Sequence, residues 1–158
     1  MSINPLIGRW VTASVSEHVR PTAVDTLGLS YFVEGVDVEQ PAWFQQDSLV
    51  LRVTGPQVRP GSGVTRYKFE VMTMLTDLLH GGENGFLNHD RMGTIANALC
   101  SPIPVFAYGS GDAQVGCLDI DREAANDFLR IVHFGKLDKD SEVVQAAVVV
   151  KYEICQDS

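Results

Sequence analysis

Cysteines are few in this sequence, and long apolar runs are missing. Cys100, Cys117 and Cys155 form no C-x-x-C pair and show no metal-ligand spacing, so we expect reduced thiols in a cytosolic setting. No apolar run is long enough to span a bilayer, and no basic stretch followed by an apolar core opens the chain. We therefore expect neither a membrane segment nor a signal peptide.

Charged residues are also scarce, at 20% of the 158 residues. Soluble domains typically have about 25%, so the deficit fits a subunit that covers part of its surface in an assembly. Lys and Arg number 12 against 20 Asp and Glu, which gives a net charge of −8. Such a chain is a poor candidate for binding nucleic-acid phosphates, because this binding requires clustered Lys and Arg.

Histidines and acidic residues gather in one glycine-rich turn, at His80, Glu83, His89 and Asp90. Their spacing matches neither a helical H-x-x-x-H pattern nor a zinc-finger pattern. A polar turn with a helix cap is the simpler interpretation, and a metal site is the alternative. No cofactor-binding motif is present, since neither GSG segment is followed by the Lys-Ser/Thr of a phosphate loop.

Paired carboxylates at Asp119 and Asp121 allow acid–base chemistry, but a strand end that leads into a solvated turn explains them more simply. A small enzyme would have to assemble its site from dispersed residues such as His89, Asp90, Asp119 and His133. We therefore expect no catalytic residues, and keep the enzyme as an alternative.

Alternating apolar residues predict two antiparallel strands, Leu49–Val53 and Tyr67–Leu75. The segment between them, Gly55–Gly63, contains two prolines, three glycines and a serine. This composition does not suit a regular ladder and predicts a loop. The sequence thus predicts a long hairpin with a loop of nine residues.

Four residues are candidates for contact with a partner. Val58 and Arg59 lie in the hairpin loop, where an apolar anchor beside a planar cation is typical of interfaces; a solvated connection is the alternative. Trp43 and Phe44 lie in a second loop and are either interface anchors or aromatic rings that fold back onto the core.

The remaining elements follow from periodicity and caps. We expect a first helix, capped by Asn4 and started by Pro5, to end before Pro21, followed by a connector at 21–28 and a strand at 29–38. A second helix should span 90–99, capped by Asn88 or Asp90.

Short strands are expected at 105–108 and 115–120, the second with Cys117 buried. Residues 121–128 are ambiguous, although Asp121 is a good helix cap. A closing hairpin, 128–137 with 142–154, should place its second strand centrally, because that strand is apolar on both faces.

Together these patterns predict an α+β fold in a single domain, residues 1–158, with one antiparallel or mixed sheet. Its sheet should contain Leu49–Val53, Tyr67–Leu75 and Val144–Tyr152. The core should include the apolar members of the amphipathic patterns, namely Trp10, Phe69, Val71, Ile95, Leu99 and Val148.

Four segments carry a resemblance to a known family: NPLIGRWVTASV, RYKFEVMTMLTDLL, NHDRMGTIANAL and QAAVVVKYEI. In this order, and over most of the chain, they resemble tail-terminator proteins, also called tail-completion proteins, of long-tailed phages. The resemblance implies a curved, mostly antiparallel sheet with a long extended hairpin, packed against two helices. It also implies a hexameric ring that caps the tail tube at its head-proximal end, without catalysis or cofactor.

The implied partners are further copies of the chain, the tail tube protein and the head connector or stopper protein. DNA would pass through the ring without specific binding, and the acidic balance fits because a negative lumen repels phosphates. Such a protein is made in the host bacterial cytoplasm and ends in the virion. Another neck or tube component remains the alternative among virion proteins.

Overall fold

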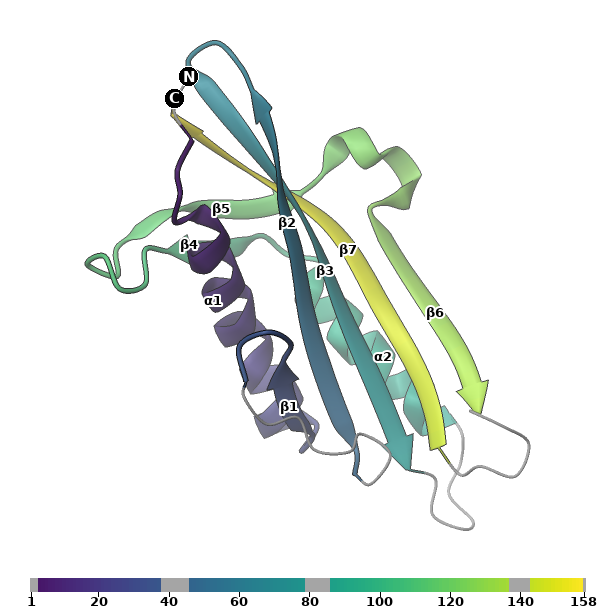
Figure 1. Cartoon of the computed structure of the whole chain (residues 1–158). Coiled ribbons are helices and arrows are strands. Elements are labelled where there is room, and N and C mark those ends of the chain that lie inside the picture. The colour runs from purple at the N-terminus through teal and green to yellow at the C-terminus, as the bar shows by residue number, and fades with distance from the viewer. Residues whose placement is uncertain (1–2, 38–45, 79–85, 137–142, 158) are drawn as a thin grey trace.

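Figure 1 shows the computed structural model of the chain, which describes residues 3–37, 46–78, 86–136 and 143–157. Two α-helices, α1 (Ile7–Arg20) and α2 (Phe86–Leu99), pack on the same face of a strongly curled sheet. Short helical turns, η1 (Pro21–Thr26) and η3 (Arg122–Asp127), follow α1 and the fifth strand. The strands are β1 (Ser30–Val33), β2 (Ser48–Pro60), β3 (Val64–Leu78), β4 (Ile103–Phe106), β5 (Gln114–Ile120), β6 (Leu129–Lys136) and β7 (Val143–Asp157).

In the described part of the chain the sheet has seven strands, in the order β1-β2-β3-β7-β5-β4, with β6 also beside β7. Every pairing is antiparallel except that of β1 with β2. The pairing of β3 with β7 runs from Val64 opposite Asp157 to Leu78 opposite Val143. The predicted α+β fold, the three predicted sheet segments and the central place of the last strand are confirmed.

The core lies between the sheet and the helices. A stripe of Ile7, Val11 and Val15 buries one side of α1, since a four-residue spacing keeps side chains on one helix face. Five of the six predicted core residues are buried: Phe69, Val71, Ile95, Leu99 and Val148. Trp10 is half-buried and packs against the edge of the core instead. None of the described helices has the length and apolar content needed to cross a bilayer.

The predicted nine-residue loop is wrong. Strand β2 continues to Pro60, and residues 57–60 pair with 65–68 of β3, so only residues 61–63 turn the chain. The β2–β3 ladder accommodates the glycines and prolines of this segment through one register shift between Thr54 and Gln57. The hairpin therefore projects as paired strands beyond α1, with the end of β7 as a third strand alongside (Figure 1).

Two helix boundaries also differ from the prediction. Asn4 does not cap α1; its side chain accepts a hydrogen bond from Leu6 N, and the helix begins at Ile7. The predicted connector after Pro21 is helical, because η1 is a π-helix, a wider turn that tolerates the proline's missing N–H. Helix α2 begins at Phe86, so Asn88 and Asp90 lie inside it rather than at its cap.

Three strand predictions need smaller corrections. Strand β1 ends at Val33, because the chain turns at Gly35, whose φ is +81°. Strand β4 begins and ends two residues earlier than predicted. Cys117 is exposed rather than buried, since it lies on the face of β5 that no helix covers. The predicted cap at Asp121 is confirmed: its side chain accepts a hydrogen bond from Glu123 N at the start of η3.

Candidate functional site

A one-residue bulge in β2 borders a polar hollow on the projecting hairpin. Thr54 pairs with Glu70 and Gln57 pairs with Lys68, so β2 has one residue more than β3 in this interval. Because strand side chains alternate between faces, one extra residue reverses the alternation. Val58 consequently faces the core, and Gln57 joins Thr54 on the face turned away from the helices.

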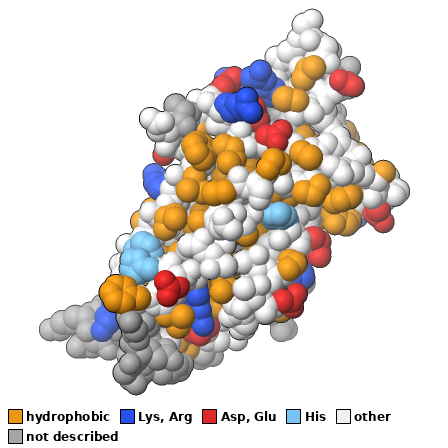
Figure 2. All heavy atoms as spheres, turned by 180° about the vertical axis from the view of Figure 1, so that it is seen from behind, with side chains coloured by type: hydrophobic (Ala, Val, Ile, Leu, Met, Phe, Trp, Pro, Cys, Tyr) orange, Lys and Arg blue, Asp and Glu red, His pale blue; other side chains and the backbone are white. Residues whose placement is uncertain are grey.

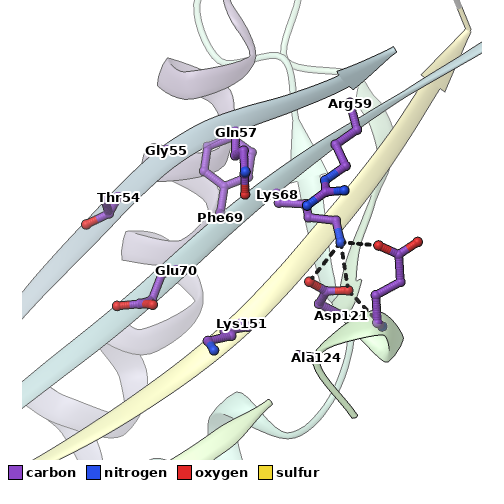
Figure 3. Close-up of a pocket in the computed structure, with 11 residues that line it drawn as sticks. Thr54, Gly55, Gln57, Arg59, Lys68, Phe69, Glu70, Asp121, Ala124 and Lys151 are labelled. Atoms are coloured by element: carbon purple, nitrogen blue, oxygen red, sulfur yellow. Dashed lines mark hydrogen bonds and ion pairs between the residues drawn. The ribbon is translucent and has the colours of Figure 1, made fainter. Parts of the chain in front are cut away.

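Glycine is required at the bulge itself. The φ of Gly55 is +128°, a conformation that L side chains rarely adopt, and an added Cβ would lie 2.8 Å from the carbonyl oxygen of Lys68. The close approach brings β2 onto β3 at Lys68 and Phe69. The bulge thereby opens a cavity of about 420 Å³ on the helix-free face, lined in part by Arg59, Lys68 and Asp121 (Figure 3).

A buried cation anchors this cavity. Lys68 Nζ lies 3.3 Å from an Asp121 carboxylate oxygen and 2.5 Å from Glu123 Oε2. The Lys68 and Asp121 side chains are about one-tenth exposed, whereas that of Glu123 is half-exposed. Arg66 Nη1 also pairs with Glu123, at 2.5 Å. These pairs fasten η3 and the end of β5 onto the middle of the hairpin.

The electrostatic surroundings favour the charged forms of Lys68 and Glu123. The hydrogen bond with Glu123 raises the pKa of Lys68, although partial desolvation opposes the shift. The same hydrogen bond, with the nearby Lys68, Arg66 and Arg59 charges, lowers the pKa of Glu123. An amine held as an ammonium ion cannot act as a nucleophile or a general base. The arrangement therefore suits recognition of a charged group better than covalent catalysis.

A second polar cluster lies at the other end of β3. Asp77 is buried and pairs with Arg91, and it accepts a hydrogen bond from Asn88 Nδ2 at 2.8 Å. Asn88 Oδ1 lies 3.3 Å from His133 Nδ1, and the rings of His133 and His89 stack with centroids 3.9 Å apart. Burial, followed by the nearby His89, lowers the pKa of His133.

The dispersed enzyme site considered from the sequence is only partly brought together. His89 and His133 meet, and Asp90 follows His89 in α2. Asp119 lies elsewhere, in a hollow shared with Arg66 and Glu153. Of the four residues in the possible metal cluster, His80 and Glu83 lie outside the described residues. Within the described ranges, no group of three or more His, Cys, Asp or Glu residues is placed to hold a metal ion.

The interface candidates fall into three environments. Trp43 and Phe44 lie outside the described residues. Val58 is half-buried and packs against the core of its own chain. Arg59 is exposed and lines the bulge cavity. The sequence analysis missed the Lys68–Asp121–Glu123 cluster. Two signals were available: Lys68 lies within an alternating strand, and Asp121 is a helix cap far along the chain.

Comparison with known proteins gives a fold and no family. No family model and no curated protein matches the chain. Among solved structures, 24 chains match it. One of these, a protein that carries only a serial designation, aligns over 94% of this chain and 92% of its own, with 13% identity and a TM-score of 0.50. At that identity the likeness supports the fold alone.

Proposed function

We propose that this chain is a structural virion protein of the tail-terminator kind. It forms a ring at the head-proximal end of a phage tail, caps the tail tube and joins it to the head connector. The order of its elements, which resembles that family, is one support. The observation that carries the proposal is a pair of uncovered strand edges on opposite sides of the sheet.

In the edge strands β4 and β1, one backbone N–H each donates a hydrogen bond to a side chain of the same chain. The N–H of Phe106 in β4 donates a hydrogen bond to Ser14 Oγ of α1, at 3.0 Å. At the opposite end, the N–H of Val33 in β1 donates to Asp37 Oδ2, at 2.7 Å. An unpaired edge invites another strand, so covering it prevents unwanted association.

Two edges have no partner among the described residues. Beyond Leu51, β2 is paired on one side only, because β1 reaches no further than that residue. Strand β6 pairs with β7 alone, and it exposes Ile131 by 40% and Phe134 by 55%. These edges flank the β3–β7 centre from opposite sides. An edge on each side favours head-to-tail contact between copies, which closes into a ring when the rotation allows.

The composition supports the same proposal. A ring through which DNA passes must not retain it, and a net charge of −8 per copy disfavours phosphate binding. In this proposal the tail tube protein and the connector or stopper protein are the other partners, and the protein is made in the host cytoplasm before it enters the virion.

The test is the assembly state of the purified full chain, measured by size-exclusion chromatography with light scattering and by negative-stain electron microscopy. We expect single rings of six copies. A protein that stays monomeric at all concentrations contradicts the proposal, and rings that stack into long tubes favour the alternative tube component.

Two matched variants test whether the β6 edge takes part in ring formation. Ile131→Glu places a charge on the free β6 edge and should weaken ring formation. Val115→Glu, at a similarly exposed position on β5, should not, because it lies outside the two edges proposed as the interface. Equal behaviour of the two variants would remove β6 from the interface.

A further inference from the structure

The projecting hairpin carries an unbalanced pair of like charges. Arg59 of β2 lies directly opposite Arg66 of β3, and both side chains are exposed on the helix-free face. Like charges opposite each other across an antiparallel ladder are destabilising. Arg66 is relieved by its pair with Glu123. Within the described ranges, Arg59 has no hydrogen-bond or ion-pair partner.

The cations around the cavity differ in whether a carboxylate bonds them. Lys68 forms an ion pair with Asp121, and both side chains are about one-tenth exposed. Glu123 already receives Arg66 and Lys68, and Arg59 only contributes to its electrostatic surroundings. Glu70 also lines the cavity and lies opposite Lys151 in the β3–β7 ladder. Lys151, on the cavity's other side, is occupied by Asp127 at 2.8 Å. The free guanidinium of Arg59 therefore borders an open space of about 420 Å³.

We propose that Arg59 is a docking site for a carboxylate side chain of a second copy of this chain, received in the bulge cavity between Arg59 and Lys68 (Figure 3). The inference rests on the proposed ring and names a contact within it. The planar guanidinium donates two parallel hydrogen bonds to a carboxylate, a geometry that gives direction as well as affinity. The third strand and the N-terminal segment hold the hairpin in place, since Asn4 bonds both Tyr67 and Gln156.

Charge complementarity selects a second copy as the occupant. Each copy has 20 acidic residues against 12 basic ones, so carboxylates without a cation abound on its surface. A phosphate chain is the other anion that an arginine recognises, and the net charge of −8 repels it as it repels a second copy, so net charge does not separate the two. The test must therefore separate carboxylate docking from phosphate binding.

The test measures the dissociation constant of assembly by light scattering over a concentration series, with wild type and three variants of the full chain. Arg59→Ala should raise that constant by about 10-fold to 100-fold, the expected loss for one charge-assisted pair. The dissociation constant of Arg59→Lys should lie between those of wild type and Arg59→Ala. Lysine keeps the positive charge but lacks the planar guanidinium that donates two parallel hydrogen bonds. Arg20→Ala is the control, since Arg20 is an exposed arginine of α1, outside both strand edges, and already pairs with Glu17.

The outcomes separate this inference from the proposed ring. Wild-type rings with an unchanged constant for Arg59→Ala overturn the inference and leave the ring standing. An equal loss for Arg20→Ala also overturns it, because the effect is then unspecific. A wild type that never assembles overturns both. Fluorescence anisotropy with a short duplex DNA completes the test: binding that Arg59→Ala abolishes, with assembly unchanged, assigns the site to phosphate instead.

Discussion

The two ends of β3 carry charged clusters of opposite design. At one end Asp77 is 1% exposed, and its partners Arg91 and Asn88 complete their hydrogen bonds inside the chain. At the other end Arg66 and Glu123 are half-exposed, and Arg59 is left without a partner in the described part of the chain. A buried network must be complete, because an unpaired buried charge is costly. An exposed cluster need not be complete, so a partner molecule can supply the carboxylate that Arg59 lacks.

Figure 2 shows how the buried end meets the surface on the helix side. Histidine side chains gather beside apolar ones near the described start of α2, and further apolar groups lie over the middle of this face. The exposed apolar residues of this end include Phe86, whose ring lies 6.4 Å from that of His89. The completed network therefore meets the surface beside histidine and apolar side chains.

The largest expected effect comes from breaking the buried cluster. Asp77→Ala removes the acceptor of the Asn88 amide and one of the two carboxylates that pair with Arg91, the other being Asp47, and should lower the free energy of unfolding by about 2–4 kcal/mol. Urea unfolding followed by circular dichroism measures it. Asp77→Asn, which keeps the volume and one acceptor, should cost less. A loss below about 1 kcal/mol for the alanine variant would show that the network does not stabilise the fold.

Next in size is the bulge that shapes the exposed cluster. Gly55→Ala forces a Cβ toward the Lys68 carbonyl at a positive φ, and should cost about 1–3 kcal/mol. Thermal and urea unfolding measure the loss. Gly93→Ala in α2 is the control, since nothing lies within 4 Å of that position and alanine favours a helix by up to about 1 kcal/mol. Equal stability of the Gly55 variant and wild type would contradict the bulge geometry.

A smaller effect links the buried cluster to pH. Because the folded pKa of His133 lies below its unfolded value, the unfolded chain binds more protons as the pH falls through about 6.5. Stability should decline there, and the decline is complete below the folded pKa. Urea unfolding between pH 7.5 and pH 5 tests this against His133→Gln, which should show a shallower dependence. Identical pH dependence for both would remove His133 as the source.

The smallest effect concerns the exposed cluster. The folded pKa of Glu123 is lowered, so its contribution is present above the ordinary glutamate value and is lost as the pH falls through the folded pKa. Solvent screens this half-exposed group, so the contribution is small. A carbon-detected NMR titration of the Glu123 carboxyl should give a midpoint below the usual range, and a midpoint within that range would show that the Lys68 and Arg66 contacts are not maintained in solution.

Sequence periodicity predicted the body of the fold because each long strand holds one alternation along its length, as in Tyr67, Phe69 and Val71. It failed at Gly55 and Pro56 for a physical reason. The bulge reverses the alternation, so Val53 and Val58 both face inward although they are an odd number of positions apart. A pattern that changes phase beside glycine and proline resembles a loop.

The candidate site was less accessible to prediction from the sequence. Lys68 and Asp121 are 53 positions apart, and only the return of η3 against the hairpin brings them together. Arg59 was identified as an interface candidate from its residue type, but its register with Arg66 depended on the bulge. Likewise Asn88 has the composition of a helix cap, while its buried bond to Asp77 required the tertiary fold.

The most direct test of the account is hydrogen–deuterium exchange on assembled and diluted protein. Backbone amides at 52–60 of β2 and 129–133 of β6 should exchange more slowly in the assembled state, because a neighbouring copy covers both edges. Amides of α2 around Asn88 and Arg91 should be unchanged. Protection confined to other surfaces, or no difference at either edge once rings have formed, would contradict the claim that these two edges join the copies.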